Sequence, residues 1–245
     1  MDAILARGKV IAGVSFDIPG MGYRNPQTGV IEGFEPDLAR AIAAKLLGAP
    51  DRVEFQPVTD AARIPLLQSD RVDMVASQLT ITPDREEQVD FSIPYWVTRE
   101  ALLVPKGSPI NGFDDLKGKR VTAVTGSVSI RRMKAALPDE TLVETPLSAD
   151  CLKVIAAGEA DAASNDFINL TMLQRASGNP DAYRIIDIGN HFDEKPFGVA
   201  VKKGRRSLVD LLNDAITTLK ANGEIEKLLK ENIERLGAVA NLSRG

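Results

Sequence analysis

The chain has 245 residues, of which 44% are hydrophobic and 26% charged, and its 30 Lys and Arg against 34 Asp and Glu give a formal net charge of −4. This length suffices for one large domain or two modest ones. A mildly acidic chain with 5% aromatic residues lacks the basic, stacking surface that nucleic acids or anionic membranes require. One Cys and one His exclude a disulfide framework and a Cys/His zinc site, and a Ser-His-Asp triad would have to use His191. We expect no metal and no cofactor.

The sequence predicts no membrane insertion, because no apolar run approaches the roughly 20 residues that span a bilayer. The chain starts with Met1-Asp2-Ala3 and continues directly into a helix-like stretch, so we expect no signal peptide in it. Two interpretations stay open at this point: a cytoplasmic protein, or a mature segment with a new initiator Met.

The first hundred residues alternate short β-rich runs with helical patterns, which is typical of an α/β chain with largely parallel sheets. Leu38 and Ile42 lie on one face of a helix that stops at Gly48, and Thr59 is a plausible N-cap for the next helix. The predicted elements are strands at 9–14, 53–55 and 72–76, a helix at 34–47, and a helix that carries Ile64, Leu66 and Leu67.

A second module with the same rhythm begins near residue 100, and no short repeat is present. Gly158 and Gly223 mark helix ends. The predicted elements are strands at 101–104, within 118–124, at 160–164 and at 198–201, helices at 127–137 and 149–157, and two C-terminal helices before a frayed end at 240–245.

The most informative segment runs from Ser77 to Tyr95, where a strand enters a polar Thr-Ile-Thr-Pro turn. A strand end is where open α/β sheets bind their ligands. Thr80 and Thr82 offer hydroxyl groups, and Arg85 offers a fork that matches a carboxylate. The alternative for this segment alone is an N-cap at Thr82 followed by an exposed arginine.

The run TITPDREEQVDFSIPY resembles the signature of the periplasmic polar amino-acid-binding proteins, the family 3 extracellular solute-binding proteins of ABC importers. The resemblance covers essentially the whole chain, and the glutamate- and aspartate-binding members resemble it best. The other matching motifs follow in the order of the family: GKVIAGVSFDIPG, GVIEGFEPDLARAIAAKLLG, ARIPLLQSDRVDMVAS, DDLKGKRVTAVTGS, GEADAASND and KPFGVAVKKG.

This resemblance implies a bilobal type II periplasmic-binding-protein fold with two α/β lobes joined by two hinge crossings. Lobe 1 is expected at 1–97 plus 199–245 and lobe 2 at 98–198, with crossings near 96–100 and 191–197. Ligand is expected to bind in the cleft and to be trapped when the hinge closes.

The resemblance also assigns residues to the two charged groups of an amino acid. The α-carboxylate is expected to meet Arg85, the backbone N–H of Thr80 and the strand-to-helix turn at Gly126 and Ser127, where unpaired N–H groups favour an anion. The α-ammonium is expected to meet Asp166, the carbonyl of Gln78 and the hydroxyl of Thr80. Taken alone, Ser127 and Asp166 could equally be helix caps.

Arg63 stands where acidic amino-acid binders place a second arginine for the distal carboxylate of the ligand, and its alternative is a surface helical arginine. Some glutamate and aspartate binders have a Lys in the first-strand loop, where this chain has Ser15, and the same loop carries Asp17. Asp60, near the expected cleft, could repel an anionic ligand or hold Arg63 by a salt bridge. Glutamine or another polar amino acid therefore stays open.

The function expected from the resemblance is capture of glutamate or aspartate by a monomeric, periplasmic or extracellular binding protein that serves an inner-membrane ABC permease. A dehydratase on the same fold, with Asp60 or Asp17 as general acid, and a sensor domain are the alternatives. Cys151 is expected in the core, and His191 at a hinge or rim.

Overall fold

The computed structural model describes residues 1–138 and 141–242, and the side chains of 237–242 are not described. The contacts divide the chain into two compact units. Unit 1 comprises Met1–Phe16, Gly20–Val97 and Pro196–Arg235, and unit 2 comprises Asp17–Pro19, Thr98–Lys195 and 236–242. The chain therefore passes between the units five times, at Phe16–Asp17, Pro19–Gly20, Val97–Thr98, Lys195–Pro196 and Arg235–Leu236.

Unit 1 is built on a five-stranded sheet in the order β5-β1-β6-β13-β7. β1 runs parallel to β5 and β6, whereas β13 runs antiparallel to β6. The strands of unit 1 are β1 (Val10–Val14), β3 (Gly22–Arg24), β4 (Ile31–Glu32), β5 (Val53–Pro57), β6 (Met74–Val75), β7 (Val89–Thr98) and β13 (Lys195–Lys202), the last residue of β7 and the first of β13 lying in unit 2. The helices are α1 (Asp2–Arg7), α2 (Phe34–Leu47), α3 (Arg63–Gln68), α4 (Pro83–Glu86), α8 (Arg206–Ala221) and the greater part of α9 (Glu224–Leu242).

Helix α2 has the bounds that the sequence predicts. Leu38 and Ile42 are buried on its inner face, and Gly48 ends it in the left-handed conformation. At its start, Gly33 has φ 135°, and a Cβ there would meet the carbonyl oxygen of Met21 at 2.5 Å. Glycine has no Cβ, so it tolerates both this positive φ and the close approach of the Met21 oxygen. That oxygen can therefore accept a hydrogen bond from the N–H of Glu35 at 3.0 Å. The entry of α2 is thus fixed beside Met21.

Helix α3 does not begin as the sequence predicts. Its N-terminal flanking residue is Ala62, which makes no side-chain cap bond, so the predicted N-cap at Thr59 is wrong. The carbonyl of Thr59 instead accepts from the N–H of Ala62 in the preceding turn. The helix therefore begins at Arg63, and its first side chain turns into the interior of unit 1, where 1% of it is exposed.

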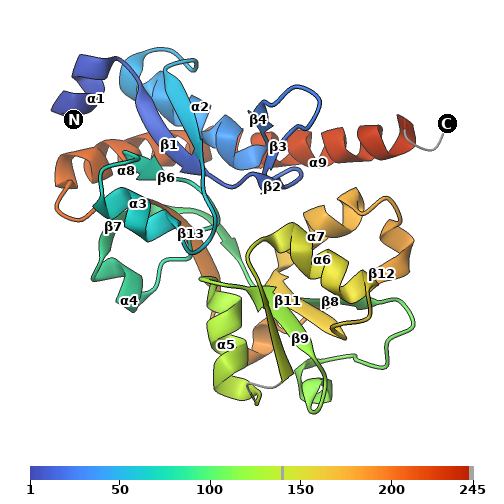
Figure 1. The fold of residues 1–245 in the computed structure, drawn as a ribbon. Coiled ribbons are helices and arrows are strands. Elements are labelled where there is room, and N and C mark those ends of the chain that lie inside the picture. Colours follow the sequence, from blue (N-terminus) through green and yellow to red (C-terminus); the bar gives the residue numbers. More distant parts are fainter. Residues whose placement is uncertain (139–140, 243–245) are drawn as a thin grey trace. The chain divides into compact units, whose positions relative to one another are not determined.

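Unit 2 has its own five-stranded sheet, in the order β10-β9-β11-β8-β12. In Figure 1, α6 and α7 lie side by side against this sheet. β9 runs parallel to β10 and β11, whereas β8 runs antiparallel to β11 and β12. The strands are β2 (Asp17–Ile18), β8 (Glu100–Pro105), β9 (Val121–Val124), β10 (Leu142–Thr145), β11 (Ala162–Asp166) and β12 (Tyr183–Asp187); the helices are η1 (Phe113–Leu116), α5 (Val128–Ala136), α6 (Ser148–Ala156), α7 (Phe167–Ala176), η3 (Pro180–Ala182) and η4 (Gly189–His191).

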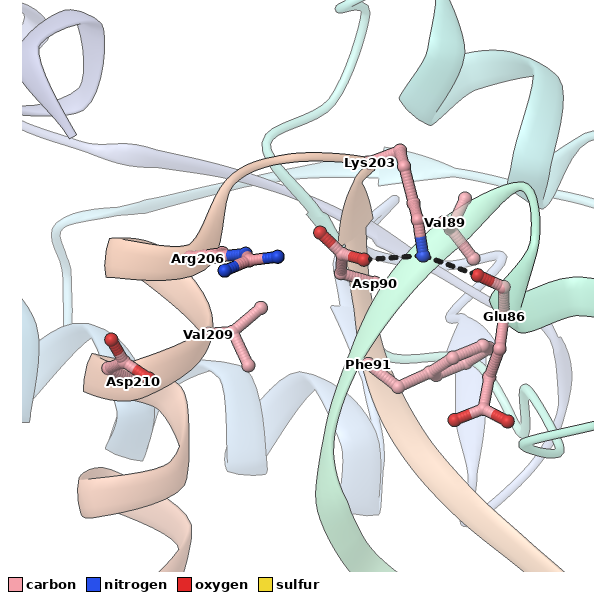
Figure 2. Close-up of a pocket in the computed structure, with 8 residues that line it drawn as sticks. All are labelled: Glu86, Val89, Asp90, Phe91, Lys203, Arg206, Val209 and Asp210. Atoms are coloured by element: carbon pink, nitrogen blue, oxygen red, sulfur yellow. Dashed lines mark hydrogen bonds and ion pairs between the residues drawn. The ribbon is translucent and has the colours of Figure 1, made fainter.

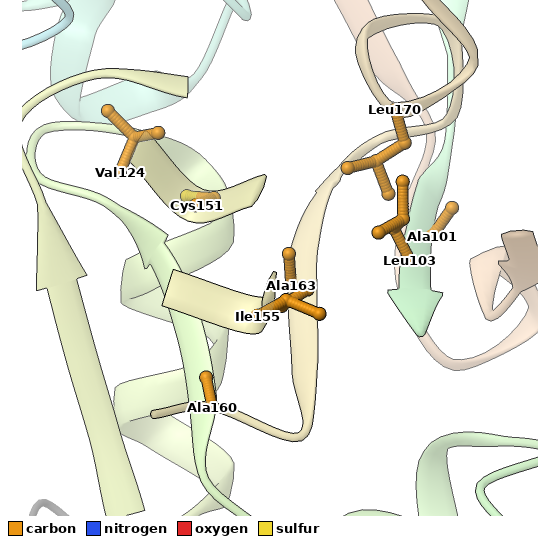
Figure 3. Packing of buried hydrophobic residues seen from close by; sticks show 8 residues of the cluster. All are labelled: Ala101, Leu103, Val124, Cys151, Ile155, Ala160, Ala163 and Leu170. Carbon is orange, nitrogen blue, oxygen red and sulfur yellow. The ribbon is translucent and has the colours of Figure 1, made fainter. Parts of the chain in front are cut away.

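One of two hydrophobic clusters in unit 2 forms where α6 and α7 cover the sheet. Figure 3 shows this packing, in which Cys151 and Ile155 of α6 join Leu170 of α7 and Leu103 of β8. Cys151 is buried, as the sequence predicts, and burial raises the pKa of its thiol. The buried strands explain the apolar runs of this module.

Both five-stranded sheets are mixed, which corrects the expectation of largely parallel sheets. β8, which follows the passage at Val97–Thr98, runs antiparallel to β11 and β12, and β13, which contains the passage at Lys195–Pro196, runs antiparallel to β6. Within the described residues, no helix is both long and apolar enough to span a bilayer.

Candidate functional site

A buried carboxylate organises the polar turn of unit 1. Glu35, in the first turn of α2, is fully buried, and its Oε1 accepts bonds from the hydroxyl of Tyr95 at 2.5 Å and from the N–H of Gln78 at 2.7 Å. Its Oε2 accepts from the side-chain amide of Gln78, which also donates to the Oγ of Ser15 at 3.1 Å. These contacts hold Gln78 at φ 43°, in the left-handed region that non-glycine residues rarely adopt.

Burial raises the pKa of Glu35 to about 7. The hydrogen bonds from Tyr95 and Gln78 and the charge of Arg63 all act in the opposite direction, but they do not outweigh the loss of hydration. Burial and the neighbouring carboxylate raise the pKa of Tyr95 as well, so its hydroxyl remains a donor. Neither Glu35 nor Tyr95 is predicted from the sequence as part of a site.

Arg63 lies inside unit 1 and holds the same turn from its other side. Its Nη1 donates to the carbonyl oxygens of Ser77 at 2.7 Å and Gln78 at 3.2 Å. Its Nε donates to the carbonyl of Asp60 at 3.0 Å, and its Nη2 lies 3.1 Å from Asp60 Oδ2. The surface alternative for Arg63 is therefore wrong, and of the two possibilities for Asp60 the structure shows the salt bridge with Arg63.

Arg85 is also buried, so the alternative of an exposed arginine is wrong for it too. Its Nη1 donates to the carbonyl oxygen of Thr80 at 2.8 Å. The backbone of Thr80 forms an isolated antiparallel β-bridge with Phe197 of β13, and this bridge attaches the turn to the sheet. Thr82 occupies the N-terminal flank of α4 but makes no side-chain cap bond. The turn therefore presents Thr80 and Arg85 together.

In unit 1 the structure thus brings the predicted residues into two contacting groups: Ser15, Gln78 and Arg63 around Glu35, and Thr80 with Arg85. These groups adjoin in sequence at the end of β6, since Gln78 and Thr80 are two residues apart. The assignment of these residues to an amino-acid ligand stays a prediction.

In unit 2 Gly126 and Ser127 precede α5, and the side chain of Asp17 reaches from β2 to the start of α6. Ser127 caps α5, where its Oγ accepts from the N–H of Ile130 at 3.1 Å, and Gly126 before it has φ 86°. Asp17 Oδ2 accepts from the N–H of Ala149 at 3.1 Å, in the first turn of α6. Helix starts of this kind supply N–H donors.

Asp166 ends β11 and occupies the N-cap position of α7, as the alternative predicts, but its side chain makes no cap bond. Its Oδ1 lies 2.8 Å from the Nζ of Lys195, and its Oδ2 accepts from the amide of Asn169 at 3.3 Å. Lys195 is almost completely buried. Lys195 belongs to the motif KPFGVAVKKG, but the sequence predicts no role for it, because periodicity does not reveal a buried charge.

A surface pocket of about 490 Å³ lies elsewhere in unit 1, between β7 and the start of α8. Figure 2 shows the ammonium of Lys203 between the carboxylate of Asp90 and the backbone oxygen of Glu86. Burial raises the pKa of Asp90, but bonds from Lys203 and from the N–H of Gly204 outweigh it and hold the pKa below 3.8. The charges of Lys203 and Asp90 pair with each other. None of the predicted ligand residues lines this pocket.

Metal ligands do not gather in the part of the chain that the structure describes: it has no group of three His, Cys, Asp or Glu side chains that could hold an ion. The ring of the exposed His191 lies beside that of Phe113, with centroids 5.0 Å apart and the ring planes tilted by 36°.

The chain matches the bacterial extracellular solute-binding proteins, family 3, over residues 10–234. The ABC transporter glutamine-binding protein GlnH of Bacillus subtilis is 34% identical over 233 residues, covering 95% of this chain and 84% of that protein. The glutamate-binding protein GluB of Corynebacterium efficiens is 30% identical over 243 residues, covering 94% and 81%. The solved structure of the amino acid ABC transporter substrate-binding protein AbpA of Streptococcus pneumoniae, bound to L-arginine, has a TM-score of 0.87 at 25% identity and covers 96% of this chain and 99% of that one.

The structural likeness confirms the fold class, two lobes with mixed α/β sheets as in type II periplasmic binding proteins. The narrower resemblance to acidic amino-acid binders is not confirmed, since the glutamine-binding relative is more similar than the glutamate-binding one. The extent of the family match, together with these relatives, makes this chain a member of the family 3 bacterial extracellular solute-binding proteins, a binding component rather than an enzyme.

Proposed function

We propose that L-glutamine is the ligand of this amino-acid substrate-binding protein of an ABC transporter. The observation that carries the proposal is the state of Arg63, whose guanidinium already pairs with Asp60 and donates to two carbonyl oxygens. A cation compensated in this way offers little net charge to a second carboxylate, whereas an uncharged amide needs no counter-ion. The greater similarity to the glutamine-binding relative supports the same choice.

We infer that the two charged ends of the amino acid meet groups from both units. Arg85 and the N–H of Thr80 receive the α-carboxylate, with N–H groups at Gly126 and Ser127 from unit 2. Asp166, with the carbonyl of Gln78 and the hydroxyl of Thr80, receives the α-ammonium. The two units act as lobes that close on the ligand, because only the closed state makes all of these contacts.

Glutamate is the second candidate, and one observation favours it. Arg63 is buried beside the turn that carries Gln78, and a buried guanidinium can accept a further anionic partner if Asp60 turns away. The 30% identity to a glutamate-binding relative also supports glutamate as a candidate ligand. We further propose that the protein is monomeric, acts in the periplasm or outside the cell, and delivers its ligand to an inner-membrane permease.

The test is calorimetric titration of the purified protein with L-glutamine, L-glutamate, L-aspartate and L-arginine, supported by thermal denaturation. A ligand that binds only the folded state raises the melting temperature. We expect glutamine to bind at least tenfold more tightly than glutamate. Tighter binding of glutamate would replace the first candidate by the second, and binding of arginine alone would overturn both.

A further inference from the structure

The ammonium of Lys195 lies at the centre of a buried ionic cluster in unit 2. Its Nζ is 2.8 Å from Asp166 Oδ1, 3.3 Å from Glu100 Oε2 and 2.9 Å from the Oγ of Ser129. Its three contacts match the three donors of an ammonium group. About 1% of Lys195 is exposed, so water does not screen these contacts.

Glu100 joins the cluster to a second cation. Its Oε2 lies 3.0 Å from Arg132 Nη1, and its Oε1 accepts from the hydroxyls of Ser129 at 2.6 Å and Ser164 at 2.9 Å. Burial raises the pKa of Glu100, but the charge of Lys195, the two hydroxyl bonds and the charge of Arg132 outweigh it and lower the pKa below 4.5. Two carboxylates thus share two cations, and the formal charge of these four groups is zero.

The backbone fixes the members of this cluster. Asp166, the last residue of β11, is paired in register with Glu100, the first residue of β8. Lys195 is the first residue of β13 and the last residue of unit 2 before the chain returns to unit 1. Lys195, Asp166 and Glu100 therefore each stand at the end of a strand, where the backbone sets the position of their Cα atoms.

The contact between Lys195 and Asp166 affects whether a ligand must supply a cation to pair with Asp166. An isolated buried carboxylate must be paired with a cation, and a ligand without one would leave it uncompensated. Asp166 already has such a cation. A second ammonium on the same carboxylate would lie within about 5 Å of Nζ, where like charges repel by an amount that corresponds to a factor on the order of a hundred in affinity.

We propose that Lys195 is a specificity-determining residue that sets how strongly the binding site requires an α-ammonium group on its ligand. By neutralising Asp166, it allows the site to accept a 2-hydroxy acid of the same shape as the amino acid. This inference rests on the proposed function, because it takes Asp166 as the residue that faces the α-substituent.

The experiment compares two ligands that differ in one group: L-glutamine and (S)-2-hydroxyglutaramate, which has a hydroxyl in place of the ammonium. L-glutamate and (S)-2-hydroxyglutarate replace them if the wild type binds glutamate more tightly. Calorimetry gives both dissociation constants for the wild type, Lys195→Met and Lys195→Arg. We expect the wild type to prefer the amino acid by less than about a hundredfold, and Lys195→Met to raise that preference at least tenfold.

Lys195→Arg keeps the charge and should restore the preference to within threefold of the wild type. Arg132→Met is the matched control, because it removes one cation from the same cluster without touching Asp166, and its preference should also stay within threefold. The double variant Lys195→Met/Glu100→Gln removes one cation and one carboxylate, which protects folding while Asp166 still loses its ammonium partner. It should show the same rise as Lys195→Met.

An unchanged preference in both Lys195→Met and the double variant would overturn the role of Lys195 and leave the proposed function intact. Failure of the wild type to bind the 2-hydroxy acid at millimolar concentration would overturn it as well. Failure of the wild type to bind any amino acid would instead overturn the proposed function, and this inference with it.

Discussion

The hydroxyl of Tyr95 donates a 2.5 Å hydrogen bond to the carboxylate of Glu35, and both side chains are buried in unit 1. The two residues come from different elements, β7 and the first turn of α2. Their contact, together with the bonds from Gln78 to Glu35, determines the backbone of the turn that leads to Thr80.

The raised pKa of Glu35 predicts a pH-dependent stability. The pKa is about 7 in the folded protein and 4.5 ordinarily, so the folded state binds more protons between these values. The stabilisation is fully present below pH 4.5 and is lost as pH rises through 7, to a total of about 3 kcal/mol. Urea denaturation between pH 4.5 and 8 should show this decline, which Glu35→Gln should remove.

Glu159→Gln is the control for that series, because Glu159 is an exposed side chain in unit 2 and its loss should leave the pH slope unchanged. Tyr95→Phe should lower the free energy of unfolding by about 1–3 kcal/mol, since Glu35 loses a donor in a buried site. A wild-type stability that is flat over this range would contradict the shifted pKa.

Asp60→Asn should shift ligand preference toward glutamate. The substitution removes the charge that pairs with Arg63, so the guanidinium gains net charge for a distal carboxylate. We expect the ratio of glutamate to glutamine affinity to rise about tenfold in calorimetry. Asp51→Asn, at an exposed position in the same unit, should leave the ratio unchanged. An equal gain for both ligands would argue against a place for Arg63 near the ligand side chain.

Arg85→Ala should abolish binding of every amino acid, with a loss of at least a hundredfold, because the α-carboxylate is common to all of them. Arg85→Lys should recover little of it, since an ammonium cannot form the bidentate contact. Arg24→Ala, at an exposed position of the same unit, is the control in these titrations. Retained affinity in Arg85→Ala would remove this residue from the proposed site.

Gly33→Ala should destabilise the protein by about 2–4 kcal/mol or prevent folding, because Gly33 combines φ 135° with an approach of 2.5 Å to a backbone oxygen. Gly107→Ala is the matched control, since nothing lies within 4 Å of a Cβ there and its φ is ordinary. Chemical denaturation should separate the two variants. Equal stabilities would show that the loop before α2 can move aside.

Cys151 should react with a thiol reagent only when the protein unfolds. Its side chain is 2% exposed, and burial raises the pKa of the thiol, so both access and thiolate are lacking in the folded state. Labelling with iodoacetamide followed by mass spectrometry should be complete in urea and negligible in buffer. Rapid labelling of the folded protein would place Cys151 outside the core.

Local patterns predict the helices well where the core-facing residues and the end signals agree. The bounds of α2 follow from Leu38 and Ile42 on one face and from Gly48 at the end. The N-cap predicted at Thr59 is wrong because a residue type that often caps helices need not form a cap. Helix α3 starts four residues later, at Arg63. The antiparallel strands β8 and β13 depend on how the chain passes between units, which no local period encodes.

The candidate site was predictable only in part, for a related reason. The buried positions of Arg63 and Arg85 agree with residues that the motifs singled out, although their roles toward a ligand remain predictions. Glu35 and Lys195 were missed because their burial depends on partners distant in sequence. Tyr95 and Asp166 supply those partners, and a single sequence does not display such pairs.

The divided course of unit 1 has a consequence for synthesis. Thr98–Lys195 carries every strand of the unit 2 sheet, so this unit has its β partners as soon as that segment emerges from the ribosome. The earlier strands β1, β5 and β6 must wait for β13, which pairs with β6, before their own sheet is complete. Newly made chains therefore lack the β13 partner of β6 until the segment after Lys195 is made, and an unpaired strand edge favours association with other chains.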